Sequence, residues 1–218
     1  MHRRGYTRGF PDRTAAGREL GAALARRSYA APPLVLGLPR GGVPVAWEVA
    51  RALRAPLDVM IVRKVGMPGQ PELAIGAIAS GNIVVRDPDT LRFLPEDADF
   101  DALAARERIE LERREHAFRS GRPPLALQGR SVILVDDGLA TGSTMLAAVR
   151  AARQAGATTV IAAAPVASHE AVALLTPECD VVEFLLVPPS LDAIGLWYED
   201  FTQTPDSEVQ RLLALPTT

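Results

Sequence analysis

The sequence predicts an α/β fold in which a parallel sheet is covered by helices on both faces. Short apolar runs without polar alternation recur along the chain, for example at 34–38 and 131–135, and such runs are typical of strands buried on both sides. Stretches with helical spacing follow several of these runs after glycine-containing loops. The length of 218 residues, 48% of them hydrophobic, fits one domain with a substantial core.

In the first part of the chain, the elements follow from changes in hydrophobic period. We expect a helix over 14–27, capped by Asp12, because apolar residues there lean to one face and an aspartate precedes them. The remaining elements expected before residue 73 are strands at 34–38 and 57–62, a helix at 43–53 and a loop at 66–72.

The second part repeats the alternation of strand and helix around one strongly charged segment. A helix over 99–119 carries Glu and Arg at three- and four-residue spacing, which favours a solvated or lid-covering helix over a nucleic-acid arm. The other expected elements are two strands or a hairpin at 73–80 and 82–86, strands at 131–135, 159–166 and 181–186, and helices at 145–154 and 170–175.

Composition and charge exclude several classes of partner. The formal charge of -2 comes without a long block of like charge, so no broad basic field for nucleic acid or anionic membrane is predicted. No apolar run approaches the roughly 18 residues of a membrane span, and the N-terminus lacks a signal-peptide pattern. The single cysteine, Cys179, cannot form an internal disulfide. We expect a soluble cytoplasmic protein.

The segment from Val135 to Thr144 has the composition of a phosphate-binding loop. Two glycines allow close backbone approach, hydroxyl side chains add donors, and a helix N-terminus favours an anion. Asp136 and Asp137 precede this loop, where carboxylates accept hydrogen bonds from sugar hydroxyls or help to hold a hydrated divalent ion. Recognition of a diol and a phosphate by one loop predicts a ribose 5-phosphate ligand.

Residues 132–144 resemble the phosphoribosyl pyrophosphate (PRPP) binding motif of type I phosphoribosyltransferases. Two further segments fall in the order of that family. The run Leu38-Pro39-Arg40-Gly41-Gly42 resembles the loop that binds pyrophosphate, where members often carry a cis non-proline peptide. Arg63-Lys64 and the Gly/Pro stretch after them resemble the mobile catalytic loop. With the stretch GMPGQPELAIGAIA, these segments most resemble a bacterial group of phosphoribosyltransferase-like proteins.

The resemblance implies a type I phosphoribosyltransferase-like fold over residues 1–218 as a single domain. Its core covers about 30–190 and contains a central, mostly parallel five-stranded sheet flanked by helices. A small hood subdomain is formed by the N- and C-terminal segments, and the charged segment 99–119 is a helical insertion. Because the family commonly pairs subunits near the pyrophosphate loop, a homodimer is expected.

The implied activity is Mg2+-assisted transfer of ribose 5-phosphate from PRPP to a nitrogen acceptor, with release of pyrophosphate. The resemblance assigns catalysis to Arg63, Lys64 and Asp137, metal binding to Asp136 and Asp137, and pyrophosphate binding to Pro39, Arg40, Gly41, Gly42 and Lys64. It assigns PRPP binding to Asp136, Asp137, Gly138, Leu139, Ala140, Thr141, Gly142, Ser143 and Thr144. An alternative is a PRPP- or nucleotide-binding regulatory protein with the same fold and no turnover; hydrolysis is supported only by the acid pair.

Departures from the family pattern bear on the acceptor. Enzymes that act on 6-oxopurines carry an acid where this chain has Ala140, and a lysine after the next strand, where residues 162–168 contain none. Lys64 is the only lysine in the chain. The usual means of recognising an oxopurine is therefore missing. The acceptor is expected to be a nucleobase-like compound, and the sequence does not identify which.

The C-terminal segment 194–201 resembles the hood that stacks on the base. Trp197 and Tyr198 offer aromatic faces there. The resemblance also assigns Val166 to the base site. An equally open interpretation is that the two aromatic residues form a hydrophobic clasp that closes the C-terminal segment. For His169 and Glu170, capping of the next helix is favoured over contact with the base.

Overall fold

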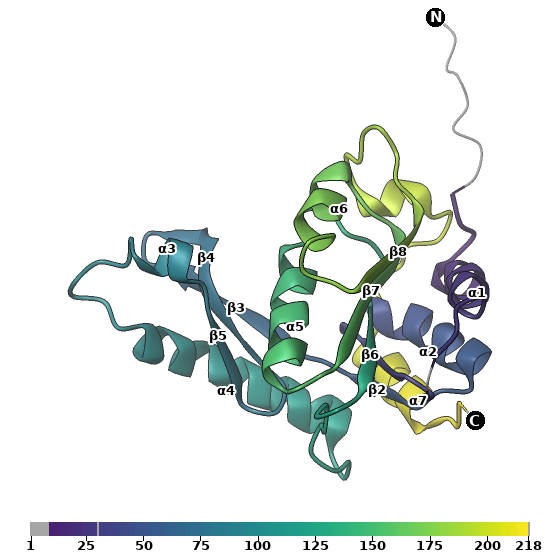
Figure 1. Ribbon diagram of the computed structural model, residues 1–218, viewed down its shortest axis with the longest axis horizontal. Helices are drawn as coiled ribbons and strands as arrows, with labels where there is room; N and C mark the ends of the chain where they lie inside the picture. Colours follow the sequence, from purple (N-terminus) through teal and green to yellow (C-terminus); the bar gives the residue numbers. More distant parts are fainter. Residues whose placement is uncertain (1–8, 30, 218) are drawn as a thin grey trace, which may run out of the picture.

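A five-stranded parallel sheet forms the centre of the computed structural model, which describes residues 9–29 and 31–217 (Figure 1). Its strand order is β2-β1-β6-β7-β8, and every neighbouring pair is parallel. The strands are β1 (Leu34–Gly37), β2 (Leu57–Val59), β6 (Ser131–Val135), β7 (Thr159–Val166) and β8 (Val181–Leu186). The predicted fold class is confirmed. Of the N-terminal segment expected in the hood, residues 1–8 lie outside the described residues.

Helices cover both faces of this sheet. Side chains alternate along each strand: Val35 packs with α1 and α2, whereas Leu34 and Leu36 pack on the opposite face with α5. The helices on the first face are α1 (Arg13–Leu24), α2 (Gly42–Leu53) and α7 (Asp206–Ala214), and those on the second are α5 (Ser143–Gln154) and α6 (His169–Leu175). Because a hydrophobic core lies on each face of the sheet, the strands are continuous apolar runs in the sequence.

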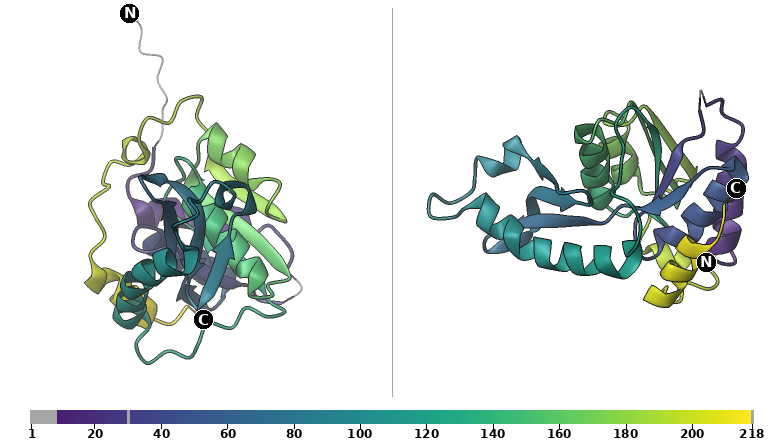
Figure 2. Two further views of the ribbon diagram at one scale, coloured as in Figure 1. Left: turned by 90° about the vertical axis from the view of Figure 1, so that its left-hand side faces the viewer. Right: turned by 90° about the horizontal axis from the view of Figure 1, so that it is seen from below.

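An arm projects from this core, as the views in Figures 1 and 2 show. It contains an antiparallel sheet of β3 (Val62–Met67), β4 (Gln70–Ala79) and β5 (Ile83–Arg86), followed by the short helix α3 (Pro88–Leu91). The long helix α4 (Phe100–Arg119) packs along this sheet through four buried side chains. These are Phe100, Ala104, Leu111 and Phe118. The predicted charged helix is therefore solvated on its outer face only, and its inner face supports the arm.

Several boundaries differ from the prediction, and the helix expected over 14–27 already ends at Leu24. The expected strand 57–62 ends at Val59 and resumes at Val62 in the other sheet, because the chain crosses from core to arm at Met60 and Ile61. Both residues are buried, so the hydrophobic pattern is continuous across the crossing. The expected loop 66–72 is wrong: it is the tip of a β-hairpin.

The hairpin tip turns at Pro68 and Gly69. Gly69 has a φ of 77°, and a proline followed by a left-handed glycine suits a two-residue reversal. Met67 pairs with Gln70 across the turn, and register shifts follow between Val65 and Met67. Gly66 lies against the backbone of Pro71, so glycine is required for this close approach. Glycine and proline here mark a tight turn inside a hairpin.

Helix starts agree with the prediction at one site and correct it at another. The Asp12 side chain accepts a hydrogen bond from the Ala15 N–H at 2.7 Å and caps α1. The cap of α6 is Ser168, whose hydroxyl accepts from the Ala171 N–H at 2.9 Å. His169 and Glu170 are thus the first residues of the helix. Among the described residues, no helix is both long and apolar enough to span a membrane.

Candidate active site

The loop between β6 and α5 forms a small anion-sized hollow at the carboxyl edge of the sheet. Gly142 adopts a φ of 75° at the start of α5, a conformation that glycine reaches without steric cost. The Thr141 and Ser143 hydroxyls lie 3.1 Å apart beside it. A cavity of about 200 Å³ is lined here by Asp136, residues 138–145 and Ile194. Backbone N–H groups, hydroxyls and the α5 N-terminus thus surround one space that suits a phosphate.

The loop after β1 lies directly against this phosphate loop. A side chain at Gly41 would overlap the Asp137 carboxylate, and one at Gly42 would press on the backbone of Val135 and Asp136. The Leu38 N–H donates to the Val135 carbonyl at 2.8 Å. The peptide bond between Pro39 and Arg40 is cis, as the resemblance implies. Both glycines are needed because the two predicted substrate loops touch.

The two acids that follow β6 have different surroundings. Burial, and then the negative charge of Asp137, raise the pKa of Asp136 well above its ordinary value. One Asp136 carboxylate oxygen accepts the Asp137 N–H at 2.9 Å. The Asp137 carboxylate instead accepts from Arg13 Nε at 2.7 Å, and both of these side chains are little exposed. Within the described residues, Asp137 is thus the acid of the two that pairs directly with a cation.

Arg13 is a site residue that sequence reasoning missed. Its guanidinium stacks 3.9 Å from the centre of the Phe201 ring and donates to the Thr202 carbonyl at 2.8 Å. The Tyr198 hydroxyl donates to the Asp137 carbonyl at 2.6 Å. Arg13 and Asp137 are 124 positions apart, and nothing local in the sequence marks the first turn of α1. The N- and C-terminal segments therefore meet at the second acid of the motif.

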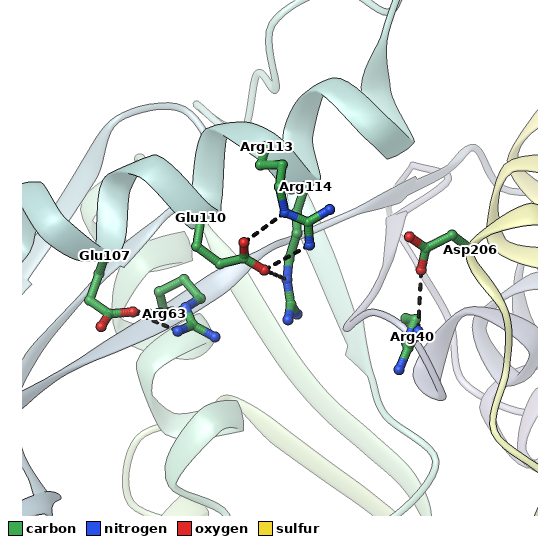
Figure 3. A network of polar contacts seen from close by, with 7 residues as sticks. All are labelled: Arg40, Arg63, Glu107, Glu110, Arg113, Arg114 and Asp206. Atoms are coloured by element: carbon green, nitrogen blue, oxygen red, sulfur yellow. Dashed lines mark hydrogen bonds and ion pairs between the residues drawn. The ribbon is translucent and has the colours of Figure 1, made fainter.

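The three predicted cationic residues reach different neighbours. Arg40 Nη1 lies 3.4 Å from Asp206, and Arg63 donates twice to Glu107, at 2.9 and 2.7 Å (Figure 3). Lys64 Nζ lies 3.2 Å from the Ser143 hydroxyl and also lines an apolar cavity of about 200 Å³ between the arm and α5. The structure thus brings Lys64, which the resemblance places in the mobile catalytic loop, to the phosphate loop, and its assignment to pyrophosphate binding stays a prediction.

The residues expected to face a base occupy other positions. Val166 is fully buried, and the Tyr198 ring packs between Phe10 and Phe201, with ring centres at 5.6 and 4.9 Å. Both side chains are buried, and the packing of the Tyr198 ring is that of a clasp; contact of these residues with a base stays a prediction. Burial raises the pKa of the Tyr198 hydroxyl, which stays a donor to Asp137. Trp197 is partly buried in the same cluster.

The fold and the arrangement of these loops define a protein of the phosphoribosyltransferase class. Residues 14–182 match the phosphoribosyl transferase domain family, and the chain belongs to it.

Similar proteins extend this likeness to nearly the whole chain. Two proteins from Mycobacterium tuberculosis strains, named "Putative phosphoribosyl transferase" Rv0571c and MT0597, are each 48% identical over 94% of this chain. The match covers 46% of their length, so the chain spans about half of these curated relatives. The crystal structure of TT1426 from Thermus thermophilus is 47% identical, with a TM-score of 0.87 over 94% of this chain and 97% of that one.

Proposed function

We propose that the chain binds PRPP and transfers its ribose 5-phosphate to a nitrogen acceptor, releasing pyrophosphate with inversion at the anomeric carbon. One observation carries this proposal: the phosphate loop and the Pro39–Gly42 loop are in contact, with the Asp137 carboxylate against Gly41. A phosphate site and a second anion site thus lie on either side of a carboxylate pair. The two anion sites suit the two phosphorylated ends of PRPP, and the carboxylates suit its diol. Family membership supports the same class of reaction.

The proposed roles follow from position. N–H groups and hydroxyls of residues 138–144 bind the 5-phosphate, with Lys64 beside Ser143. Asp136 and Asp137 accept from the ribose hydroxyls, and Asp137 keeps its orientation through Arg13. Arg40 and Arg63, with the N–H groups of the glycines, bind the leaving pyrophosphate. Because the transition state is oxocarbenium-like, stabilising that leaving group and excluding water supply the catalysis.

The donor set fits Mg2+. No group of three or more His, Cys, Asp or Glu side chains is gathered into a metal site within residues 9–29 and 31–217. Mg2+ is commonly held by one or two carboxylates together with water and substrate phosphates, and Asp136 and Asp137 provide such a pair. When bound, the ion would neutralise charge on the leaving pyrophosphate.

The acceptor is proposed to be a nucleobase-like compound other than a 6-oxopurine. Ala140 stands exposed at the phosphate loop, and residues 162–168 provide no lysine to recognise an exocyclic oxygen. The segment 194–201 borders the site, since Ile194 lines the phosphate hollow. A homodimer and a cytoplasmic location belong to the same proposal, and sedimentation velocity showing a monomer would refute the dimer.

The proposal is tested by incubating the purified chain with PRPP, Mg2+ and a panel of nucleobases and amines while pyrophosphate release is followed. We expect acceptor-dependent release with at least one compound, and strong loss of that release in Asp137→Asn. Calorimetric titration with PRPP measures binding in parallel. Absence of both PRPP binding and release would contradict the proposal.

A PRPP- or nucleotide-binding regulator is the second candidate. It is favoured by one observation: Arg40, Arg63 and Asp137 each form an ion pair with another side chain. Each of the three must therefore exchange a protein partner before it can act on a substrate. Tight PRPP binding without release for any acceptor would select this candidate. Acceptor-dependent release of pyrophosphate by the unchanged chain at a higher rate than by the Asp137→Asn variant would select the enzyme.

A further inference from the structure

Helix α4 places a second set of arginines beside those expected at the pyrophosphate. In the view of Figure 3, the Arg114 side chain extends from α4 and lies between those of Arg63 and Arg40. Arg113, on the same turn, is close enough to Asp206 for their charges to interact, and Asp206 is the partner of Arg40. The charged face of α4 thus contacts Arg63 directly through Glu107, and it approaches the carboxylate partner of Arg40 through Arg113.

The contacts of Glu110 leave Arg114 free to change partner. Arg113 donates to both Glu110 oxygens, from Nε at 2.7 Å and Nη2 at 2.9 Å. Arg114 donates to Glu110 through Nε alone, at 2.7 Å. If Arg114 leaves, Glu110 keeps two hydrogen bonds to Arg113. Within the described part of the chain, the Nη groups of Arg114 have no hydrogen-bond partner.

The pairs around these residues are easily exchanged. Each of Arg40, Arg63 and Arg114 is about one-third exposed and is paired with a carboxylate that is itself one-third to one-half exposed. Pairs at such sites contribute little, commonly about 0–1 kcal/mol. Guanidinium groups bind phosphate oxygens through two parallel hydrogen bonds, so a diphosphate offers a better partner than these carboxylates.

We propose that Arg114 completes the pyrophosphate subsite together with Arg40 and Arg63, and that Glu110 is the partner it leaves when a diphosphate binds. This inference rests on the proposed function and extends it to a helix outside the family motifs. The ligand chemistry is a diphosphate, supplied by PRPP or by free pyrophosphate. We expect a monophosphate held by the loop after β6 to leave Arg40, Arg63 and Arg114 with their carboxylate partners.

Calorimetry with inorganic pyrophosphate, PRPP and ribose 5-phosphate tests the inference in the full chain. We expect Arg114→Gln to weaken binding of pyrophosphate and PRPP about fivefold to tenfold, the size of one charged hydrogen bond at a partly exposed site, and to leave ribose 5-phosphate binding unchanged. Glu110→Gln should tighten binding of both diphosphates, because Arg114 then starts without a competing carboxylate.

Arg106→Gln is the matched control. Arg106 lies on the same helix and is exposed, and it has no polar contact with the described residues. Its replacement by glutamine therefore removes the same charge from α4 without changing Arg40, Arg63 or Arg114. Loss in Arg114→Gln no greater than in Arg106→Gln, or weaker binding in Glu110→Gln, overturns the inference while the proposed function stands. Failure of the unchanged chain to bind either diphosphate overturns both.

Discussion

Asp137 belongs to a local sequence motif, yet the residue that holds its carboxylate comes from the other end of the chain. The Arg13–Asp137 pair has a 2.7 Å contact, and the two side chains are 11% and 13% exposed. At that burial, a carboxylate left without its partner keeps its desolvation penalty. The pair therefore links the shape of the substrate loop to the stability of the fold.

We expect Arg13→Gln to lower the free energy of unfolding by about 2–3 kcal/mol, below the full cost of breaking a fully buried pair. Denaturant unfolding measures the change. In the Arg13→Gln/Asp137→Asn double variant the two losses should not add, because each single change already breaks the pair. Arg18→Gln on the same helix is the control: its guanidinium is 67% exposed, and little change is expected. Additive losses would show that the pair is not coupled.

Residues whose role depends on neighbours in the sequence could be predicted, and those whose role depends on distant neighbours could not. Gly142 is predictable in the phosphate loop because the strand, glycine and helix start are contiguous. Arg13 gives no signal, since its partners are Asp137, Phe201 and Thr202. From the sequence, Tyr198 fits a base contact and a clasp equally well, and its buried ring has the packing of a clasp.

At the scale of elements, α4 has two faces with separate functions. Its buried residues hold the arm sheet, and its charged residues reach the cationic groups of the candidate site. The sequence pattern reveals the second face more clearly, because only four residues of the helix are buried. An amphipathic pattern this sparse resembles that of a solvated helix.

Leu111→Ala should destabilise the arm. Leu111 is 1% exposed, and replacing a buried leucine by alanine commonly costs about 2–5 kcal/mol through lost burial and a residual cavity. Ile109→Ala on the same helix should have little effect, because Ile109 is 73% exposed. Chemical denaturation compares the two. Equal losses would mean that α4 does not pack as described.

The hairpin and the crossing at Met60–Ile61 show why some elements escape prediction. A run of buried residues contains no mark of the point where a strand leaves one sheet for another. At the hairpin tip, Pro68 and Gly69 indicate a turn, but whether the flanking residues pair depends on the sheet that supports them. Strand identity is predictable where both faces are buried, and strand boundaries are not.

At the scale of the whole molecule, the chain is a parallel α/β core with an arm attached at one edge (Figures 1 and 2). The core is predictable from alternating strands and helices. How the arm sits against α5, which brings Lys64 to Ser143, is not, because it depends on packing between segments 79 positions apart. The candidate site draws on both parts.

The segment 9–11 near the N-terminus and the segment 197–200 are tied together by backbone hydrogen bonds. The Phe10 N–H donates to the Trp197 carbonyl at 2.7 Å, and the N–H groups of Glu199 and Asp200 donate to the carbonyls of Phe10 and Pro11, each at 2.9 Å. Gly9 lies so close to the Trp197 carbonyl that a side chain would not fit. These amides should therefore open as one unit in hydrogen exchange.

Mass spectrometry of deuterated peptides that cover 9–16 and 197–203 can follow this unit. In Arg13→Gln, both peptides should exchange faster by a common factor, while peptides from β6 keep their protection. Acceleration of only one peptide would show that the segments open independently. In the unchanged chain, a ligand that orients Asp137 should slow exchange in both peptides, so two segments outside the substrate loops would report occupancy of the ribose site.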